Sequence, residues 1–335
     1  MFEELKGKKV LFISTKNADY LRNTQEIRLL KEQAAVLDVI AFLDRSYFRR
    51  LLKVFWKLLT IRIGHYQAVF VGFAPQLVVP FWNWKFRRTR LYMDFFISLY
   101  DTLCFDRKKI APDSFLGKRL LALDEKTLKR GDVILADTKA HGNYFCRELG
   151  ADPEKIRVLY LEADRRIYTT HLVKRPLEAK GKFTVLYFGS ILPLQGVDIV
   201  LRAAELLKNR EDLCFYIIGP VEGRLKAPQG ENIHYIPWLE QERLSDAIAF
   251  SDLCLAGHFC ASIEKAQRTI PGKAYIYRAM EKPMILGDNP ANRELYSEKD
   301  PDIYYVRMGD GAALAEKILE IKRERDAYED ISEKN

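Results

Sequence analysis

The segment KAQRTIPGKAYIYRAMEKPMILGDNPANREL, which runs from Lys265 to Leu295, decides how this chain is interpreted. It begins with cations, continues as a helix and a short apolar strand, and ends in a polar loop that opens another helix. The backbone N–H groups and the dipole at the start of a helix favour negative charge. Lys265, Arg268 and Lys273 add side-chain charge there, which predicts an anionic ligand. A solvated basic face is the alternative explanation.

Short apolar runs and helical patterns alternate along the whole chain. The expected strands are residues 10–14, 36–43, 68–73, 90–95, 133–136, 156–161, 183–188, 213–218, 233–236, 253–256 and 283–286. Strands that alternate with helices predict an α/β fold with parallel, doubly wound sheets. The pattern restarts after the polar stretch 168–181, so we expect two Rossmann-like domains, residues 1–172 and 173–335. The last helix belongs to the second domain, with packing back on the first as an alternative.

Two such domains are expected to face a central cleft, because ligands of parallel sheets bind at the carboxyl ends of the strands. In YFGSILPLQG, Gly189 follows a strand and Gly196 precedes a helix. Glycines at such a turn let the backbone approach a phosphate closely, although an ordinary strand-to-helix turn has the same sequence. Gly219 and Trp238 follow later strands, where a base and ribose would lie. Trp238 is equally suited to a core or rim position.

These motifs resemble the C-terminal signature of glycosyltransferase family 4 (group 1), whose members have the GT-B fold. The resemblance covers most of the chain and rests on the glycine turn at Gly189, on IPGKAY, on Ala279 with Met280, on Pro283, and on Asp288 with NPANREL. The chain departs from the family pattern at five positions. Many members have arginine at Ser190 and lysine at Gln195, two glutamates are usual near Arg268 and at Ile276, and a glycine is usual at Glu281. The chain therefore resembles a variant subgroup that lacks the two-glutamate motif.

The resemblance implies a retaining, hexosyl-type transfer from a nucleotide-diphosphate sugar to a glycan or lipid-linked acceptor, without a cofactor or an obligatory metal. It implies catalytic roles for Arg268 and Lys273, whose charges would stabilise the departing diphosphate. It also implies that the donor is bound by Gly189, Ser190, Gln195, Gly196, Gly219, Trp238, Lys265, Asp288, Asn289, Ala291 and Glu294. Asp288 or Asn289 can equally cap the following helix. A catalytically silent nucleotide-sugar binder or membrane-associated scaffold protein remains the alternative, because the glutamates are missing.

Acceptor-side candidates lie in the first half. Arg22 follows the first strand and is a candidate contact for an acceptor or a phosphate. Asp94 ends the strand LYMDFF, and Asp101 follows in SLYDT. A carboxylate at such a strand end could hydrogen-bond an acceptor hydroxyl, which makes Asp94 a catalytic candidate and Asp101 an acceptor-side candidate. Helix capping or a local salt bridge explains both carboxylates equally well.

The formal net charge of +8 favours an anionic partner. Residues 45–62 and 81–90 mix arginine and lysine with tryptophan and phenylalanine, which suits the headgroup zone of an anionic bilayer. A helix packed on the core with snorkelling cations is the alternative. Nucleic acid is not expected, because no familiar nucleic-acid motif accompanies the charge.

The sequence also bears on where the protein works. No apolar stretch is long enough to span a membrane, the N-terminus lacks a signal peptide, and the five cysteines form no CxxC pair. We therefore expect a cytoplasmic protein that is peripheral on the inner face of the membrane. The expected acceptor is a precursor of a cell-envelope polysaccharide.

Overall fold

The computed structural model describes residues 1–332 and the side chains of residues 1–328. The chain divides into two compact units between Glu162 and Ala163. The sequence placed this boundary between residues 172 and 173, later in the same connecting segment. The earlier division has a structural reason, because residues of this segment bond to the second unit. The Ser245 hydroxyl donates to the carbonyl of Ile167 at 2.9 Å.

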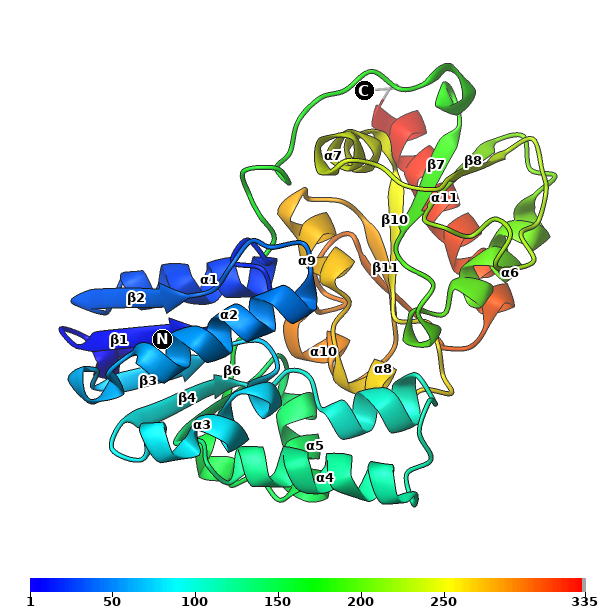
Figure 1. The fold of residues 1–335 in the computed structure, drawn as a ribbon. Helices are drawn as coiled ribbons and strands as arrows, with labels where there is room; N and C mark the ends of the chain where they lie inside the picture. The colour runs from blue at the N-terminus through cyan, green and yellow to red at the C-terminus, as the bar shows by residue number, and fades with distance from the viewer. Residues whose placement is uncertain (333–335) are drawn as a thin grey trace. The chain divides into compact units, whose positions relative to one another are not determined.

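The N-terminal unit is built on a six-stranded sheet of order β2-β1-β3-β4-β5-β6 in which all neighbours are parallel. Its strands are β1 Lys9–Ile13, β2 Val36–Ile40, β3 Ala68–Val71, β4 Arg90–Asp94, β5 Val133–Ala136 and β6 Ile156–Val158. The α-helices are α1 Leu21–Lys31, α2 Tyr47–Thr60, α3 Val79–Phe86, α4 Phe115–Leu128 and α5 Lys139–Leu149. Parallel strands need crossover connections, and these helices provide them (Figure 1).

Both faces of this sheet are covered. Side chains of α2, α3, α4 and α5 form one core cluster with one face of the strands, including Val54, Trp82 and Phe145. The N-terminal segment and α1 cover the other face, where Phe2 and Leu30 are buried. A sheet buried on both faces explains why its strands are continuous apolar runs rather than alternating patterns.

The C-terminal unit contains a second six-stranded parallel sheet, of order β12-β11-β10-β7-β8-β9. Its strands are β7 Phe183–Phe188, β8 Leu213–Ile218, β9 Ile233–Ile236, β10 Leu253–Gly257, β11 Met284–Gly287 and β12 Ile303–Val306. Its α-helices are α6 Val197–Leu207, α7 Gln241–Phe250, α8 Lys265–Arg268, α9 Gly272–Ala279, α10 Asn292–Leu295 and α11 Gly311–Ser332. The last helix, α11, packs against α6 of its own unit (Figure 1).

The predicted α/β fold with two parallel, doubly wound sheets is confirmed. Within residues 1–332, no helix combines the length and apolar character that crossing a bilayer requires. The sequence patterns did not predict the helices α3 and α4 or the edge strand β12.

Candidate functional site

Two glycine turns meet at the carboxyl ends of β7 and β8. The N–H of Gly189 donates to the carbonyl of Ile218 at 2.9 Å, and the N–H of Gly219 donates to that of Ile236 at 2.8 Å. A Cβ atom on Gly219 would lie only 2.2 Å from the Gly189 carbonyl oxygen. Gly219 also has a φ of 152°, which L side chains rarely adopt. These turns therefore require glycine, and they lie where parallel sheets bind ligands.

Lys273, the second residue of α9, reaches the same place. A Cβ atom on Gly189 would lie 3.2 Å from the Lys273 Nζ and 2.9 Å from the Gln195 Oε1. The Lys273 ammonium donates to Gln195 Oε1 and lies 4.3 Å from the centroid of the Tyr187 ring. Gln195 Oε1 also accepts a hydrogen bond from the Tyr187 hydroxyl at 3.1 Å. A cation, an amide, a phenol and a glycine backbone thus converge at one end of the sheet.

The Lys273 amine is buried without a counter-ion. Only 5% of the residue is exposed, and no described carboxylate forms an ion pair with it. Burial lowers the pKa of Lys273 to about 7, because removal from water disfavours the charged form. An anionic ligand beside the amine would restore its charge. Among the described residues of the C-terminal unit, this buried amine is the clearest indication of an anion-binding site.

The other two predicted cations lie on the preceding helix, α8. Arg268 is 8% exposed and its Nη1 lies 3.4 Å from Glu264 Oε2, whereas Lys265 is half-buried. The sequence placed all three cations at the start of one helix. The structure instead ends α8 at Arg268 and begins α9 after Pro271, which cannot donate to a continuing helix. Neither cation takes part in the contacts that join Lys273 to the glycine turn.

The loops after β7, β10 and β11 pack on one another through close backbone contacts. The N–H of Phe259 donates to the Gln195 carbonyl at 3.2 Å. A Cβ atom on Gly196 would lie 2.6 Å from the backbone N of Cys260, and one on Gly287 would lie 2.0 Å from the carbonyl of His258. Gly196 therefore serves loop packing, and this packing fixes where Gln195 presents its side chain.

In the loop after β11, Asn289 caps α10, because its Oδ1 accepts from the N–H of Asn292 at 2.8 Å. Asp288 is exposed and pairs with Arg293 at 2.6 Å, so Asn289 is the capping residue of the two candidates. The N–H of Ala291 donates to the carbonyl of Gln267 at 3.3 Å. Asn289 is 2% exposed, and its Nδ2 has no hydrogen-bond partner among the described residues. A buried amide without an acceptor is a position that a ligand oxygen would satisfy.

The remaining donor-side candidates are at the surface or close to it. Ser190 is exposed in the loop after β7, and Glu294 is half-buried on α10. Trp238 follows β9 and is 71% exposed, so it is not a core residue.

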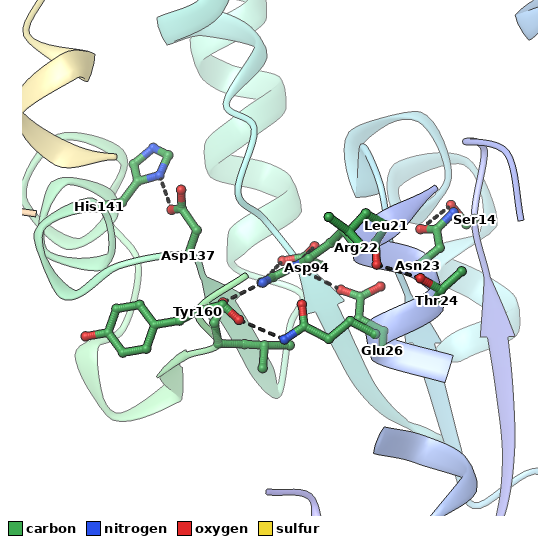
Figure 2. Close-up of polar contacts among 12 residues, drawn as sticks. Ser14, Leu21, Arg22, Asn23, Thr24, Glu26, Asp94, Asp137, His141 and Tyr160 are labelled. Carbon is green, nitrogen blue, oxygen red and sulfur yellow. Dashed lines mark hydrogen bonds and ion pairs between the residues drawn. The ribbon is translucent and has the colours of Figure 1, made fainter. Parts of the chain in front are cut away.

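In the N-terminal unit, Arg22 and Asp94 belong to a buried polar cluster at the carboxyl end of the sheet (Figure 2). Arg22 lies on α1, is 3% exposed, and binds both oxygens of Asp94 through Nε at 2.9 Å and Nη2 at 3.0 Å. Its third nitrogen donates to the carbonyl of Leu159. The pKa of Arg22 is raised, because the charge of Asp94 outweighs the effect of burial.

Asp94 therefore forms the local ion pair that the sequence left open as an alternative. The residue is fully buried, and both its oxygens accept from Arg22. As folded, Asp94 has no exposed oxygen for an acceptor hydroxyl. Asp101 is also buried, at 1% exposure, and its N–H donates to the Ser98 hydroxyl at 2.9 Å. Arg22 likewise serves this network rather than an exposed loop.

Sequence reasoning did not select three members of the cluster. Glu26 is fully buried on α1 with Oε1 3.5 Å from Arg22 Nε. Its pKa lies well above the usual range, because burial and the neighbouring charge of Asp94 disfavour a second carboxylate. Asp137 follows β5 and lies 2.6 Å from Nδ1 of the buried His141. Burial alone would raise the pKa of Asp137, but His141 and Arg22 lower it. The Asp-x-x-x-His spacing just after a strand was the available signal.

Comparison with known proteins gives a family match in the C-terminal unit. A family model described as "Glycosyl transferases group 1" matches residues 182–324. Those residues belong to that family. The match covers β7 to α11, including the glycine turns, Lys273 and the Asn289 loop. No curated protein sequence is significantly similar to the chain.

Solved structures of similar fold cover nearly the whole chain. A sucrose-phosphate synthase from Thermosynechococcus elongatus is 12% identical over 94% of this chain and 90% of its own, with a TM-score of 0.65. Anabaena HepE in complex with UDP-glucose is 13% identical over 95% and 91%, with a TM-score of 0.63. A glycosyltransferase from Rickettsia africae is 11% identical over 93% and 87%, with a TM-score of 0.56. The group 1 domain thus lies in a GT-B fold, as predicted.

The close approach of the two glycine turns predicts a sharp difference between two alanine substitutions in the C-terminal unit. Gly219→Ala should lower the free energy of unfolding by about 3 kcal/mol, because the new Cβ overlaps the Gly189 carbonyl. Gly223→Ala should cost only about 1 kcal/mol, because its φ is positive but no atom lies within 4 Å. Urea denaturation of both variants measures the difference, and equal losses would contradict the contact.

The raised pKa of Glu26 predicts that Glu26→Gln becomes more stabilising as pH rises. Above about pH 4.3 the unfolded carboxyl ionises while the folded one keeps its proton, so the wild type loses about 1.4 kcal/mol per pH unit until the folded pKa is reached. Glutamine is always neutral and avoids this loss. The unfolding free energies of both proteins should therefore diverge between pH 5 and pH 7. A constant difference between the two proteins as pH rises would contradict a raised pKa at Glu26.

Proposed function

We propose that this protein transfers a sugar from a nucleoside-diphosphate sugar to a glycan or lipid-linked acceptor, and that its C-terminal unit binds the donor. The observation that carries the proposal is the buried Lys273 amine, which lies beside the Gly189 turn without a described counter-ion. A diphosphate supplies the negative charge that this position lacks. The group 1 family match over the same residues supports this assignment.

In the proposed reaction, the bond between the anomeric carbon and the diphosphate oxygen breaks, and its electron pair stays on the diphosphate. The acceptor hydroxyl oxygen forms the new bond on the same face of the sugar, and its proton passes to the departing diphosphate oxygen. The Lys273 ammonium stabilises the charge that grows on that oxygen. Asn289 Nδ2 is assigned to a sugar or phosphate oxygen, because the buried amide lacks a protein acceptor.

In this proposal, Lys273 supplies the positive charge that arginine and lysine supply in many family members at the positions of Ser190 and Gln195. Ser190 and Gln195 are uncharged, but Gln195 binds the Lys273 amine and so directs a cation to the same turn. Arg268 and Ile276 occupy the positions of the usual glutamates. The absence of both glutamates favours a second candidate function, in which the protein binds the donor without transferring its sugar. Donor binding without release of the sugar, in the presence of candidate acceptors, would identify that protein.

The first test is a thermal-shift panel of UDP, GDP, ADP and their sugar conjugates. UDP-glucose is the first donor to include, because HepE was solved in complex with it. A ligand that binds only the folded state raises the melting temperature by mass action. We expect a selective rise with one nucleotide. No rise with any nucleotide at millimolar concentration would contradict the proposed donor site.

Replacing Lys273 should separate stability from binding. Lys273→Met should raise the melting temperature of the free protein, because the variant no longer buries an amine whose charged form is disfavoured there. The same variant should lose the shift caused by the nucleotide. Lys273→Arg, which keeps a cation, should retain part of that shift. A Lys273→Met protein that kept the full nucleotide shift would remove Lys273 from the donor site.

The pKa of Lys273 near 7 also predicts how donor affinity depends on pH. A bound diphosphate raises the pKa of the amine, so binding above pH 7 requires uptake of a proton. The dissociation constant of the nucleotide sugar should rise about tenfold per pH unit above pH 7, as measured by calorimetry. The Lys273→Arg variant should show a flat profile, since arginine stays charged. Parallel profiles for both proteins would exclude a titrating Lys273.

A further inference from the structure

The basic character of the chain is concentrated in one segment of the N-terminal unit. The 49 residues from Arg45 to Met93 contain ten arginines and lysines and no aspartate or glutamate. Subtracting these ten charges from the net charge of +8 leaves −2 for the remaining residues. The segment includes α2 and α3, which both contribute to the core cluster on one face of the sheet (Figure 1).

Helix α2 buries one face and leaves a second apolar face exposed. Val54 and Leu58 are fully buried, which accounts for its packing on the sheet. The exposed face carries Phe48, Leu52, Trp56 and Leu59, which are 65%, 54%, 69% and 62% exposed. These four positions follow the spacing i, i+4, i+8 and i+11, so they form one stripe along the helix. Packing against the core therefore explains only half of the apolar surface of α2.

Helix α3 extends this stripe. Phe81 and Trp84 are 60% and 62% exposed, and the ring of Phe81 lies 5.8 Å from that of Phe55 on α2. Lys85 donates to the carbonyl of Leu59 at 2.9 Å and so ties α3 to the end of α2. We call the six exposed side chains the α2–α3 face, and its members are Phe48, Leu52, Trp56, Leu59, Phe81 and Trp84.

Cations run alongside the α2–α3 face. Arg49, Lys53 and Lys57 each directly follow a residue of the stripe, and all three are exposed. Arg87 and Arg88 are exposed just after α3. Lys53 is paired with Asp44 at 2.8 Å, and that aspartate lies just outside the acid-free segment. The surface therefore combines aromatic and aliphatic side chains with positive charge.

We propose that the α2–α3 face docks on an anionic membrane surface. An amphipathic helix with tryptophan and phenylalanine on one face and basic residues beside it lies in the plane of a bilayer interface. Indole rings sit at the headgroup level, and the cations meet lipid phosphates. Two copies of this chain would bring like charges together if they paired through this face. Charge complementarity therefore selects an anionic lipid surface over a second copy.

Docking would hold the N-terminal unit at the membrane in which a lipid-linked acceptor resides. That consequence rests on the proposed function, whereas docking itself requires no donor and no catalysis. Vesicle binding can therefore fail while nucleotide binding succeeds, and the reverse.

The test is co-sedimentation of the full chain with vesicles of phosphatidylcholine alone and of phosphatidylcholine with one third phosphatidylglycerol. We expect binding only to the anionic vesicles, with loss of binding as salt screens the charges. Trp56→Ser with Trp84→Ser should lower the partition coefficient at least tenfold. Tyr328→Ser, at a residue 76% exposed in the C-terminal unit, is the aromatic control and should bind as the wild type does.

A second pair of variants tests the charge. Arg49→Gln with Lys57→Gln should weaken binding about 25-fold, because each cation near an anionic surface contributes about fivefold. Lys174→Gln with Lys180→Gln, at exposed positions of the C-terminal unit, is the matched control and should have no effect. The melting temperatures of all variants establish that they are folded.

Each of the following outcomes would overturn the proposal. They are failure of the wild type to bind anionic vesicles, equal binding to neutral vesicles, and unchanged binding by the double tryptophan variant. The fourth is a soluble dimer that the tryptophan substitutions dissociate, which would make the face a contact between two copies. Binding of single-stranded RNA with no binding of vesicles would likewise identify a different partner.

Discussion

One constraint dominates the C-terminal unit of this protein, namely the burial of an amine without an acid to neutralise it. Lys273 is held by an amide oxygen and the face of a tyrosine ring, and neither carries a full negative charge. A buried amine in such surroundings loses its proton readily, which is why its pKa falls to about 7. Most proteins avoid this arrangement by pairing or exposing the amine. Because this amine lies beside two close-packed glycine turns, the C-terminal unit is suited to bind an anion there.

The two units handle buried charge in opposite ways. In the N-terminal unit, Arg22 is matched by the carboxylate of Asp94, and burial together with the charge of Asp94 raises the pKa of Glu26. The charge of Arg22 is therefore balanced within the protein, although buried oxygens of Gln25 and Glu26 have no described hydrogen-bond partner. In the C-terminal unit, the Lys273 amine is buried without a described carboxylate, and the Asn289 amide nitrogen lacks an acceptor. This contrast supports a donor site in the C-terminal unit. The N-terminal unit gives less structural support for an acceptor site.

The sequence predicted the features that depend on local pattern. The parallel sheets followed from buried apolar runs, and the glycine turns at Gly189 and Gly219 followed from their places after strands. The cap by Asn289 followed from a polar loop before a helix. Features that depend on contacts distant in sequence were not predicted. Asp94 looked available at a strand end because its partner, Arg22, is 72 residues away.

Other differences have equally local causes. No sequence pattern singled out Glu26, and only the structure shows that it is buried beside Arg22, four residues earlier on α1. The break between α8 and α9 at Pro271 separated Lys273 from the other cations. The edge strand β12 is only four residues long, which makes it difficult to recognise from sequence. The basic aromatic segment was recognised from composition, but only the structure shows that α2 buries one apolar face and exposes another.

An NMR titration of the Lys273 amine, in protein labelled with carbon-13 at lysine Cε and with Lys273→Arg used to assign the signal, tests the uncompensated burial most directly. We expect a midpoint near pH 7 in the free protein, and a midpoint at least one unit higher with a saturating nucleoside diphosphate. An ordinary lysine midpoint above pH 10 in the free protein would contradict the burial of an uncompensated amine. A midpoint near 7 that no nucleoside diphosphate moves would contradict the donor site.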